Sequence, residues 1–383
     1  MFKIFILLLI IRVKVFYNKK RGDFMEREIF IVKKNYKNLD HAMDFEYLNS
    51  YLQIPKDTSV KEKEIEIDLN LELIDSDKTK KERVKIFTEE YTRQVNNSWI
   101  LFINGFSSSV DLWRFQKAEL LRSGYNLVLF DLLGQGKSSK PEGVKYTMDS
   151  QVSIVDAIVK NTELKNKKFF LVAISAGGPI AMTYANKYKE KLLGLLLIAT
   201  YVRKEGVIQF QDEITREILR LNIPDIKKQE MITKALMGLI FSDNFIRRFR
   251  PTLDNLVKEN VERNTISSIK GALYTADGFD ASLFVKNINI PTVIFSGQHD
   301  KIIDTYHSYT LANLFPNSQR YVFKGVNASH TFIIEMFETF NSVLVNELKD
   351  IEDSNFKGSN LTIYVENEYV KEEVEDKLLE IHL

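Results

Sequence analysis

Apolar and polar residues alternate along residues 64–74, EIEIDLNLELI. A period of two over this length predicts a strand with one buried face and one solvated face. The following DSDK supplies turn-forming residues, and RVKIF at 83–87 is expected to return as an antiparallel partner. The first part of the sheet is therefore predicted to be an antiparallel pair.

From residue 98 onward the strand-like segments are apolar throughout, and helix-length segments separate them. Such alternation indicates an α/β fold, a mostly parallel sheet with helices on both faces. The apolar segments are WILFING (99–105), NLVLFD (126–131), FFLVAIS (169–175), LLGLLLIAT (192–200), PTVIFSGQHD (291–300) and QRYVFKGV (319–326).

The alternation is interrupted at residues 203–285, which have helical periodicity and no strand pattern. A helical insertion between strands of an α/β sheet is typical of a cap that covers a ligand-binding or active site, so these residues are expected to form a cap. We place the α/β domain at 61–350, an N-terminal extension at 1–60 and a C-terminal tail at 351–383. Residues 25–60 are expected to be a peripheral helical segment, and the tail is expected to add a short strand, LTIYV, and an acidic helix.

The first seventeen residues, MFKIFILLLIIRVKVFY, allow two interpretations. Their uninterrupted apolar run covers only residues 4–11, whereas a membrane span needs about 20 residues. No small-residue cleavage site follows, as a signal peptide would require. Residues 1–17 are therefore either a weak membrane anchor or, with the rest of 1–24, a non-native extension that precedes a start at Met25.

Composition narrows the function classes. The 383 residues include 53 basic and 52 acidic ones, for a formal charge of +1. This balance, with no basic stripe, argues against a nucleic-acid partner. The hydrophobic content of 44% supports a sizeable core. Because the chain has no cysteine, disulfides and thiolate catalysis are excluded.

Ser175 stands where an apolar strand gives way to a helix-like segment, in FFLVAISAGGPIAM. A nucleophilic serine needs a sharp turn of this kind, which lifts its Oγ out of the sheet and aims the next N–H at a developing oxyanion. The turn requires small neighbours, and Ala173, Ala176 and Gly177 meet that need. Taken alone, the stretch fits a serine helix cap equally well.

A serine nucleophile also needs a base and an orienting acid. Among the five histidines, His330 follows a predicted strand and precedes a helix. Asp300 ends another strand at the same sheet edge, with Asp304 as the rival acid. The chain order Ser175, Asp300, His330 is the one expected for a nucleophile on a strand-to-helix turn. These three residues are the predicted catalytic set.

The segment LFDLLGQGKSS contains a Gly-Lys-Ser that could suggest a phosphate-binding loop. That motif needs a glycine five residues before Gly136, and position 131 is aspartate. We therefore expect a structural loop and no nucleotide site.

The chain resembles the α/β-hydrolase superfamily over about residues 64–348. The matching segments are INGF (103–106), FDLLGQGKSS (130–139), AISAGG (173–178), PTVIFSGQHDKII (291–303) and ASH (328–330). The sequence departs from the family pattern at two positions. Ala173 replaces the first glycine of G-x-S-x-G, and Asn104 replaces the histidine that usually precedes the loop glycine.

The resemblance implies an oxyanion hole made by the backbone N–H groups of Phe106 and Ala176, supported by Asn104, Gly105 and Gly177. It implies a cytoplasmic serine hydrolase that needs no metal or cofactor and acts on a small ester or acyl substrate. Cleavage of a carbon–carbon bond and a lysophospholipase-like activity remain enzymatic alternatives. A ligand-binding relative with an idle triad is the alternative of another class, because a fold alone does not establish function.

Overall fold

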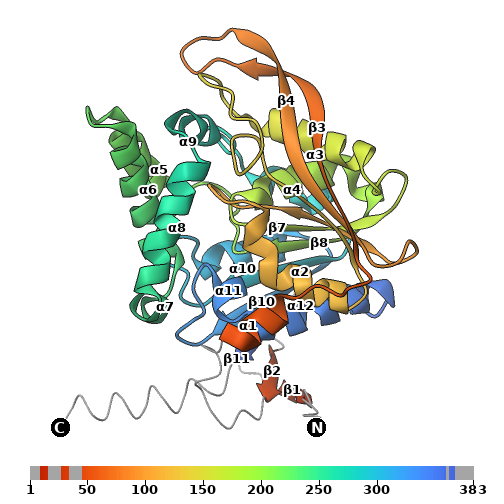
Figure 1. Cartoon of the computed structure of the whole chain (residues 1–383). Helices are drawn as coiled ribbons and strands as arrows, with labels where there is room; N and C mark the ends of the chain where they lie inside the picture. Colours follow the sequence, from red (N-terminus) through yellow and green to blue (C-terminus); the bar gives the residue numbers. More distant parts are fainter. Residues whose placement is uncertain (1–8, 16–26, 34–44, 359–361, 367–383) are drawn as a thin grey trace, which may run out of the picture.

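The computed structural model describes residues 9–15, 27–33, 45–358 and 362–366. Its described strands form one sheet of eleven (Figure 1). They are β1 (Leu9–Val15), β2 (Arg27–Lys33), β3 (Ser59–Glu72), β4 (Thr79–Thr92), β5 (Trp99–Ile103), β6 (Asn126–Phe130), β7 (Phe169–Ile174), β8 (Leu192–Ile198), β9 (Thr292–Gly297), β10 (Ser318–Lys324) and β11 (Thr362–Glu366).

The strand order is β1-β2-β11-β10-β9-β8-β7-β5-β6-β4-β3. All pairings from β6 through β5, β7, β8, β9 and β10 to β11 are parallel. The long hairpin of β3 and β4 joins this sheet antiparallel through β6. The prediction of a mostly parallel sheet that begins with antiparallel strands is confirmed.

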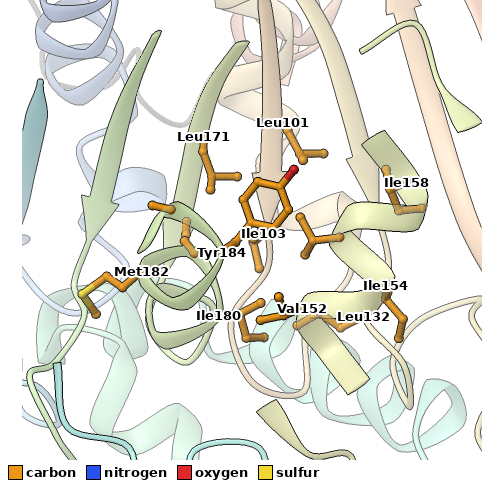
Figure 2. Close-up of a cluster of buried hydrophobic side chains, with 14 of the residues drawn as sticks. Leu101, Ile103, Leu132, Val152, Ile154, Ile158, Leu171, Ile180, Met182 and Tyr184 are labelled. Atoms are coloured by element: carbon orange, nitrogen blue, oxygen red, sulfur yellow. The ribbon is translucent and has the colours of Figure 1, made fainter. Parts of the chain in front are cut away.

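Helices cover both faces of the sheet. One face packs against α3 (Met148–Asn161), α4 (Gly177–Tyr188) and α10 (Thr305–Leu314), and the other against α2 (Arg114–Arg122) and α12 (Phe337–Glu352). The pleat divides each strand between two cores. In β5, Leu101 and Ile103 belong to the core under α3 and α4 (Figure 2). Ile100 and Phe102 belong to the opposite core. This two-sided burial explains why the central strands are apolar throughout.

Between β8 and β9 the chain forms a run of helices, within the residues 203–285 that we expect to act as a cap. Its helices stand beside the sheet, shown in green to blue-green in Figure 1. They are α5 (Val207–Arg220), α6 (Asp225–Ile240), α7 (Asp243–Arg248), α8 (Arg250–Arg263) and α9 (Ile266–Ala272). Helix α5 turns one face toward the interior, and its buried residues are Ile208, Gln211, Thr215 and Leu219. The cap is therefore an amphipathic layer of the kind that its periodicity indicates.

The expectation of a helical segment at 25–60 is wrong for residues 27–33. Among the residues of this segment that the structure describes, only α1 (Phe45–Leu52) is an α-helix, whereas β2 pairs parallel with β11 and antiparallel with β1. The run EIFIV (28–32) is rich in β-branched and aromatic residues, which favour a strand. This strand preference is local. The partner strand β11, however, lies more than 300 residues away in the sequence, so the pairing is visible only in the folded chain.

The predicted strand LTIYV corresponds to β11, which pairs parallel with β10 and so extends the main sheet. The acidic helix expected after it lies outside the described residues, as do residues 1–8 and 16–17 of the apolar N-terminal segment. Within the described residues, no helix has both the length and the apolar character needed to cross a membrane.

Candidate active site

Ser175 occupies the sharp turn between β7 and α4 that the sequence predicts. Its φ of 53° lies in the left-handed region, which is uncommon for any residue other than glycine. Three hydrogen bonds hold it there. Its N–H donates to Ile198 O at 2.9 Å, and its carbonyl accepts from Thr200 Oγ1 at 2.8 Å and from Gly178 N at 2.9 Å. A strained backbone fixed in this way is typical of functional sites.

The glycines after Ser175 are required by contact with the neighbouring strands. A Cβ at Gly177 would lie 2.5 Å from the carbonyl oxygen of Asn104, and one at Gly178 would lie 2.0 Å from Thr200 Oγ1. Both distances are far below van der Waals contact. The helix can therefore begin this close to β5 and β8 only because neither position carries a side chain.

His330 and Asp300 meet at the carboxyl edge of the sheet. His330 Nδ1 lies 2.7 Å from Asp300 Oδ2, and the Asp300 side chain is fully buried. The other Asp300 oxygen accepts hydrogen bonds from the N–H groups of Ile302 and Ile303, at 3.0 and 2.8 Å. The carboxylate is thus aimed at one imidazole nitrogen, which leaves Nε2 as the nitrogen that can act as a base.

The rival residues lie elsewhere. Asp304 caps the N-terminus of α10 by accepting a hydrogen bond from Tyr306 N at 2.7 Å. His299 is exposed. His307 is buried in α10, where desolvation lowers the pKa of its imidazole. Of the candidate acids, the structure brings Asp300 to His330.

Asn104 holds the loop that follows β5. Its fully buried amide donates to Phe130 O at 2.9 Å and accepts from Trp113 Nε1 at 2.7 Å. This explains how asparagine can stand where the family usually has histidine, since it joins the ends of two strands to the adjacent helical turn. A Cβ at Gly105 would lie 3.3 Å from Ser175 Cβ, so the loop passes very close to the serine.

The N–H groups of Phe106 and Ala176 find no acceptor within the part of the chain that the structure describes. Ala176 immediately precedes α4, so its N–H also belongs to the positive end of that helix. Both residues line the same cavity as Ser175. The two donors are therefore available to a ligand oxygen.

A cavity of about 170 Å³ joins these groups to the cap. Ser175 and His330 both line it, so the structure brings the predicted set to one site. Most of the remaining wall is apolar and comes from Leu112, Ile174, Ile208, Leu236, Ile240, Ala272, Leu273, Ala276, Ile302 and Ile303. Among the described residues, no group of three or more potential metal ligands is present.

The loop after β6 is built around Asp131 and not around a phosphate. The carboxylate of Asp131 accepts from Val110 N at 2.8 Å and from Lys137 N at 2.7 Å. Burial raises the pKa of Asp131, and these hydrogen bonds oppose that rise. A Cβ at Gly136 would lie 2.0 Å from Asp131 Oδ2, so the glycine serves this contact. The Gly-Lys-Ser sequence is thus part of a structural turn.

The family model described as alpha/beta hydrolase fold matches residues 98–335. The chain belongs to the α/β-hydrolase fold family. It is 26% identical over 243 residues to a proline iminopeptidase of Thermoplasma volcanium, covering 59% of this chain and 80% of that protein. It is 24% identical over 263 residues to a monoacylglycerol lipase of Bos taurus, covering 67% of this chain and 76% of the lipase.

Solved structures show the same fold. A thermophilic esterase from Thermogutta terrifontis superposes with a TM-score of 0.61 at 18% identity, covering 74% of this α/β-hydrolase and 99% of the esterase. A hydrolase from Pseudomonas aeruginosa gives a TM-score of 0.61 at 17% identity, covering 74% and 98%. The curated relatives include lipases and a peptidase, which supports a hydrolase role for this protein.

Three residues at the site were not anticipated from the sequence. Thr200 ties the turn of Ser175 to β8, Glu335 accepts hydrogen bonds beside His330, and Gln211 reaches the cavity from the cap. Thr200 could have been found from the sequence, because it ends an apolar strand-like segment at the same sheet edge as Ser175. Gln211 and Glu335 could not have been found in this way, since polar residues on helices are ordinarily exposed to solvent.

Proposed function

We propose that this α/β-hydrolase cleaves a carboxylic ester, with Ser175 as nucleophile, His330 as base and Asp300 as the orienting acid. The observation that carries the proposal is the 2.7 Å contact between His330 Nδ1 and a fully buried Asp300 carboxylate, beside a strained serine in the same cavity. Paired groups of this kind activate a serine hydroxyl that is otherwise a poor nucleophile.

In the first half of the reaction, Ser175 Oγ attacks the carbonyl carbon while His330 Nε2 accepts its proton. Asp300 holds the tautomer with the proton on Nδ1 and stabilises the imidazolium that forms. The negative carbonyl oxygen is stabilised by the N–H groups of Phe106 and Ala176, and each such donor contributes about 3 kcal/mol to lowering the barrier. Collapse of this intermediate expels the alcohol, which takes the proton from His330.

In the second half, water attacks the acyl carbon of the Ser175 ester. His330 removes a proton from the water and then returns it to Ser175 Oγ as the acid product leaves. The same two N–H groups stabilise the second oxyanion. Every proton transfer is thus assigned to a side chain of this chain, and the cycle restores the starting enzyme.

The apolar wall of the cavity supports an acyl-type substrate, because apolar surface removed from water there lowers the free energy of binding. The volume of about 170 Å³ is below the ~300–1,000 Å³ of common ligand pockets, which favours a short acyl group. We expect the cap to select the substrate and the sheet edge to perform the chemistry.

Intact-mass analysis after fluorophosphonate treatment tests the nucleophile. The wild-type protein should gain one adduct, Ser175→Ala should gain none, and its kcat on a soluble ester should fall about 10⁶-fold. Ser108→Ala is the matched control, because Ser108 lines the same cavity, and it should keep the adduct. An adduct on Ser175→Ala would overturn the assignment. No adduct on folded wild-type protein would instead indicate a binding protein with an idle site.

A further inference from the structure

A set of polar side chains lies in the otherwise apolar cap wall of the cavity. Gln211 and Thr215 stand one turn apart on α5, and Tyr201, Lys204 and Asp212 lie beside them in the lining. None of these residues belongs to the reacting groups. Their position on the cap places them where a substrate extends away from Ser175.

The charged members of this set neutralise one another. Lys204 Nζ lies 2.6 Å from Asp212 Oδ2, 2.9 Å from Leu273 O and 3.3 Å from Asp277 Oδ1. Arg216 contributes a second cation to Asp277 at 3.4 Å. Two cations thus face two carboxylates, and the lysine has three acceptors. A charged substrate group would find no unmatched charge here.

Two neutral groups in the same wall have little or no hydrogen bonding to the protein. Tyr201 is 3% exposed and Gln211 is 6% exposed. Within the described chain, the Tyr201 hydroxyl has no hydrogen-bond partner, and the Gln211 amide meets only Thr215 Oγ1, at the limiting distance of 3.5 Å. That threonine hydroxyl already donates to Gln211 O at 2.8 Å. Buried polar groups are nearly always hydrogen-bonded, so these two poorly paired groups on the cavity wall are free to bond a polar group of a ligand.

The aromatic ring of Tyr201 has a fixed environment. It packs in a small cluster with Ile208, Ala276 and Ile303, and its edge meets the ring of Phe279 at 6.5 Å between centroids. Burial raises the pKa of Tyr201, so the phenol stays neutral and can both donate and accept. The ring is therefore held in place before a ligand binds, which reduces the entropic cost of binding.

We propose that Tyr201 and Gln211 form a subsite for a neutral hydroxyl group of the substrate, so that the preferred ester bears a hydroxyl on the part that lies against the cap. The proposal rests on the ester hydrolase function proposed above. A hydroxyl matches the subsite because the phenol and the amide each offer a donor and an acceptor. Carboxylate, phosphate and ammonium groups are disfavoured because Lys204, Asp212 and Asp277 already balance one another.

Matched esters test the subsite by turnover. One pair differs on the acyl side, 4-nitrophenyl hexanoate against 4-nitrophenyl 6-hydroxyhexanoate. The other differs on the alcohol side, butyl butanoate against 4-hydroxybutyl butanoate followed by pH-stat. For at least one pair, kcat/KM should favour the hydroxylated ester at least tenfold after correction for the intrinsic alkaline hydrolysis rates. A site built to bond a hydroxyl discriminates strongly against an analogue without it.

Variants assign the preference to the two residues. Gln211→Leu and Tyr201→Phe should each bring the hydroxyl-to-methyl ratio close to one. Gln209→Leu is the matched control, because Gln209 is exposed on the same helix and bonds Glu213 at 3.1 Å. Tyr306→Phe is the control for the phenol, since Tyr306 is 53% exposed. Both controls should keep the wild-type ratio.

Binding to Ser175→Ala measures the same preference without turnover. Calorimetry should give a Kd at least tenfold lower for the hydroxylated member of the favoured pair, and Gln211→Leu in this background should abolish the difference. Equal Kd values for both pairs would overturn the subsite, whatever the catalytic result. A Kd preference without ester turnover or fluorophosphonate labelling would instead overturn the hydrolase function and leave the subsite standing.

Discussion

At the scale of single residues, the proposed nucleophile depends on an unfavourable backbone conformation. A left-handed residue other than glycine costs on the order of 1–3 kcal/mol, and Ser175 adopts this conformation with φ of 53°. Its carbonyl is held by Thr200 and Gly178, and its N–H is held by Ile198. The surrounding strands therefore supply the free energy that keeps the hydroxyl lifted out of the sheet.

A change of the Asp300 carboxylate to an amide should show how far catalysis depends on this residue. We expect Asp300→Asn to lower kcat about 10⁴-fold, because an amide facing His330 Nδ1 favours the wrong tautomer. Asp304→Asn should have little effect on kcat, since asparagine caps a helix about as well as aspartate. The measurement is steady-state kinetics on a soluble ester, with the melting temperature of each variant as the check on folding. A large loss in Asp304→Asn alone would reverse the two roles.

Among the secondary-structure elements, a half-buried carboxylate joins the cap to the loop that carries His330. Glu335 ends the short helix α11 (Phe332–Glu335). It accepts from Ser242 N at 3.0 Å, at the junction of α6 and α7, and also from the Ser242 hydroxyl. On the other side it accepts from Ser329 Oγ at 2.5 Å and Thr331 Oγ1 at 3.0 Å. Thr331 N–H also donates to Ile240 O of the cap at 3.1 Å.

Removing this carboxylate should loosen both the cap and the histidine loop. We expect Glu335→Ala to destabilise the fold by about 1–3 kcal/mol, because it leaves several buried donors without an acceptor. It should also lower kcat more than it raises KM, since His330 loses a fixed position. Glu335→Gln keeps one acceptor oxygen and should recover part of kcat. The measurements are denaturant unfolding and steady-state kinetics on a soluble ester.

Asp243→Asn is the matched control for Glu335, because Asp243 also joins the cap to the body, through an exposed ion pair with Lys301 at 2.6 Å. Lys301 lowers the pKa of Asp243, but solvent screens such a pair, so the variant should change stability little. If Glu335→Ala matched Asp243→Asn in both stability and kcat, the carboxylate would be an ordinary surface contact.

At the scale of the whole molecule, the proposed site and the N-terminal strands lie in different parts of the sheet. The reacting groups follow β7, β9 and β10, whereas β1 is the edge strand beyond β2 and β11. In Figure 1 the pair of β1 and β2 lies below the main body, away from the cap helices. β2 pairs with β11 as well as with β1. Loss of β1 would therefore leave the connection to the main sheet intact.

A chain that begins at Met25 should fold and hydrolyse a soluble ester with the kcat/KM of the full chain. The reason is that deletion removes one edge strand and no residue of the cavity. Co-sedimentation with liposomes, compared for both chains, measures whether residues 1–24 add membrane affinity. One short apolar segment should give only weak and reversible binding. A truncated protein that folds but does not turn over the ester would show that the segment shapes the site.

The class of fold could be predicted from the amino-acid sequence, because each strand carries its own local pattern. The alternation at residues 64–74 specified a half-buried strand, and the apolar runs such as FFLVAI specified strands covered on both faces. It also placed Ser175, Asp300 and His330 on one edge, since the carboxyl ends of parallel strands share that edge. Small residues around Ser175 marked the tight turn for the same local reason.

Which distant residues meet became clear from the folded chain alone. It brought the Asp300 carboxylate within 2.7 Å of His330 and left Asp304 as a helix cap, a contact between segments 30 residues apart that the strand pattern could only suggest. It placed β11 between β10 and β2, and it turned Gln211 of the cap toward the cavity. Strand order and cap docking depend on contacts between segments far apart in the chain, and the local hydrophobic period does not encode them.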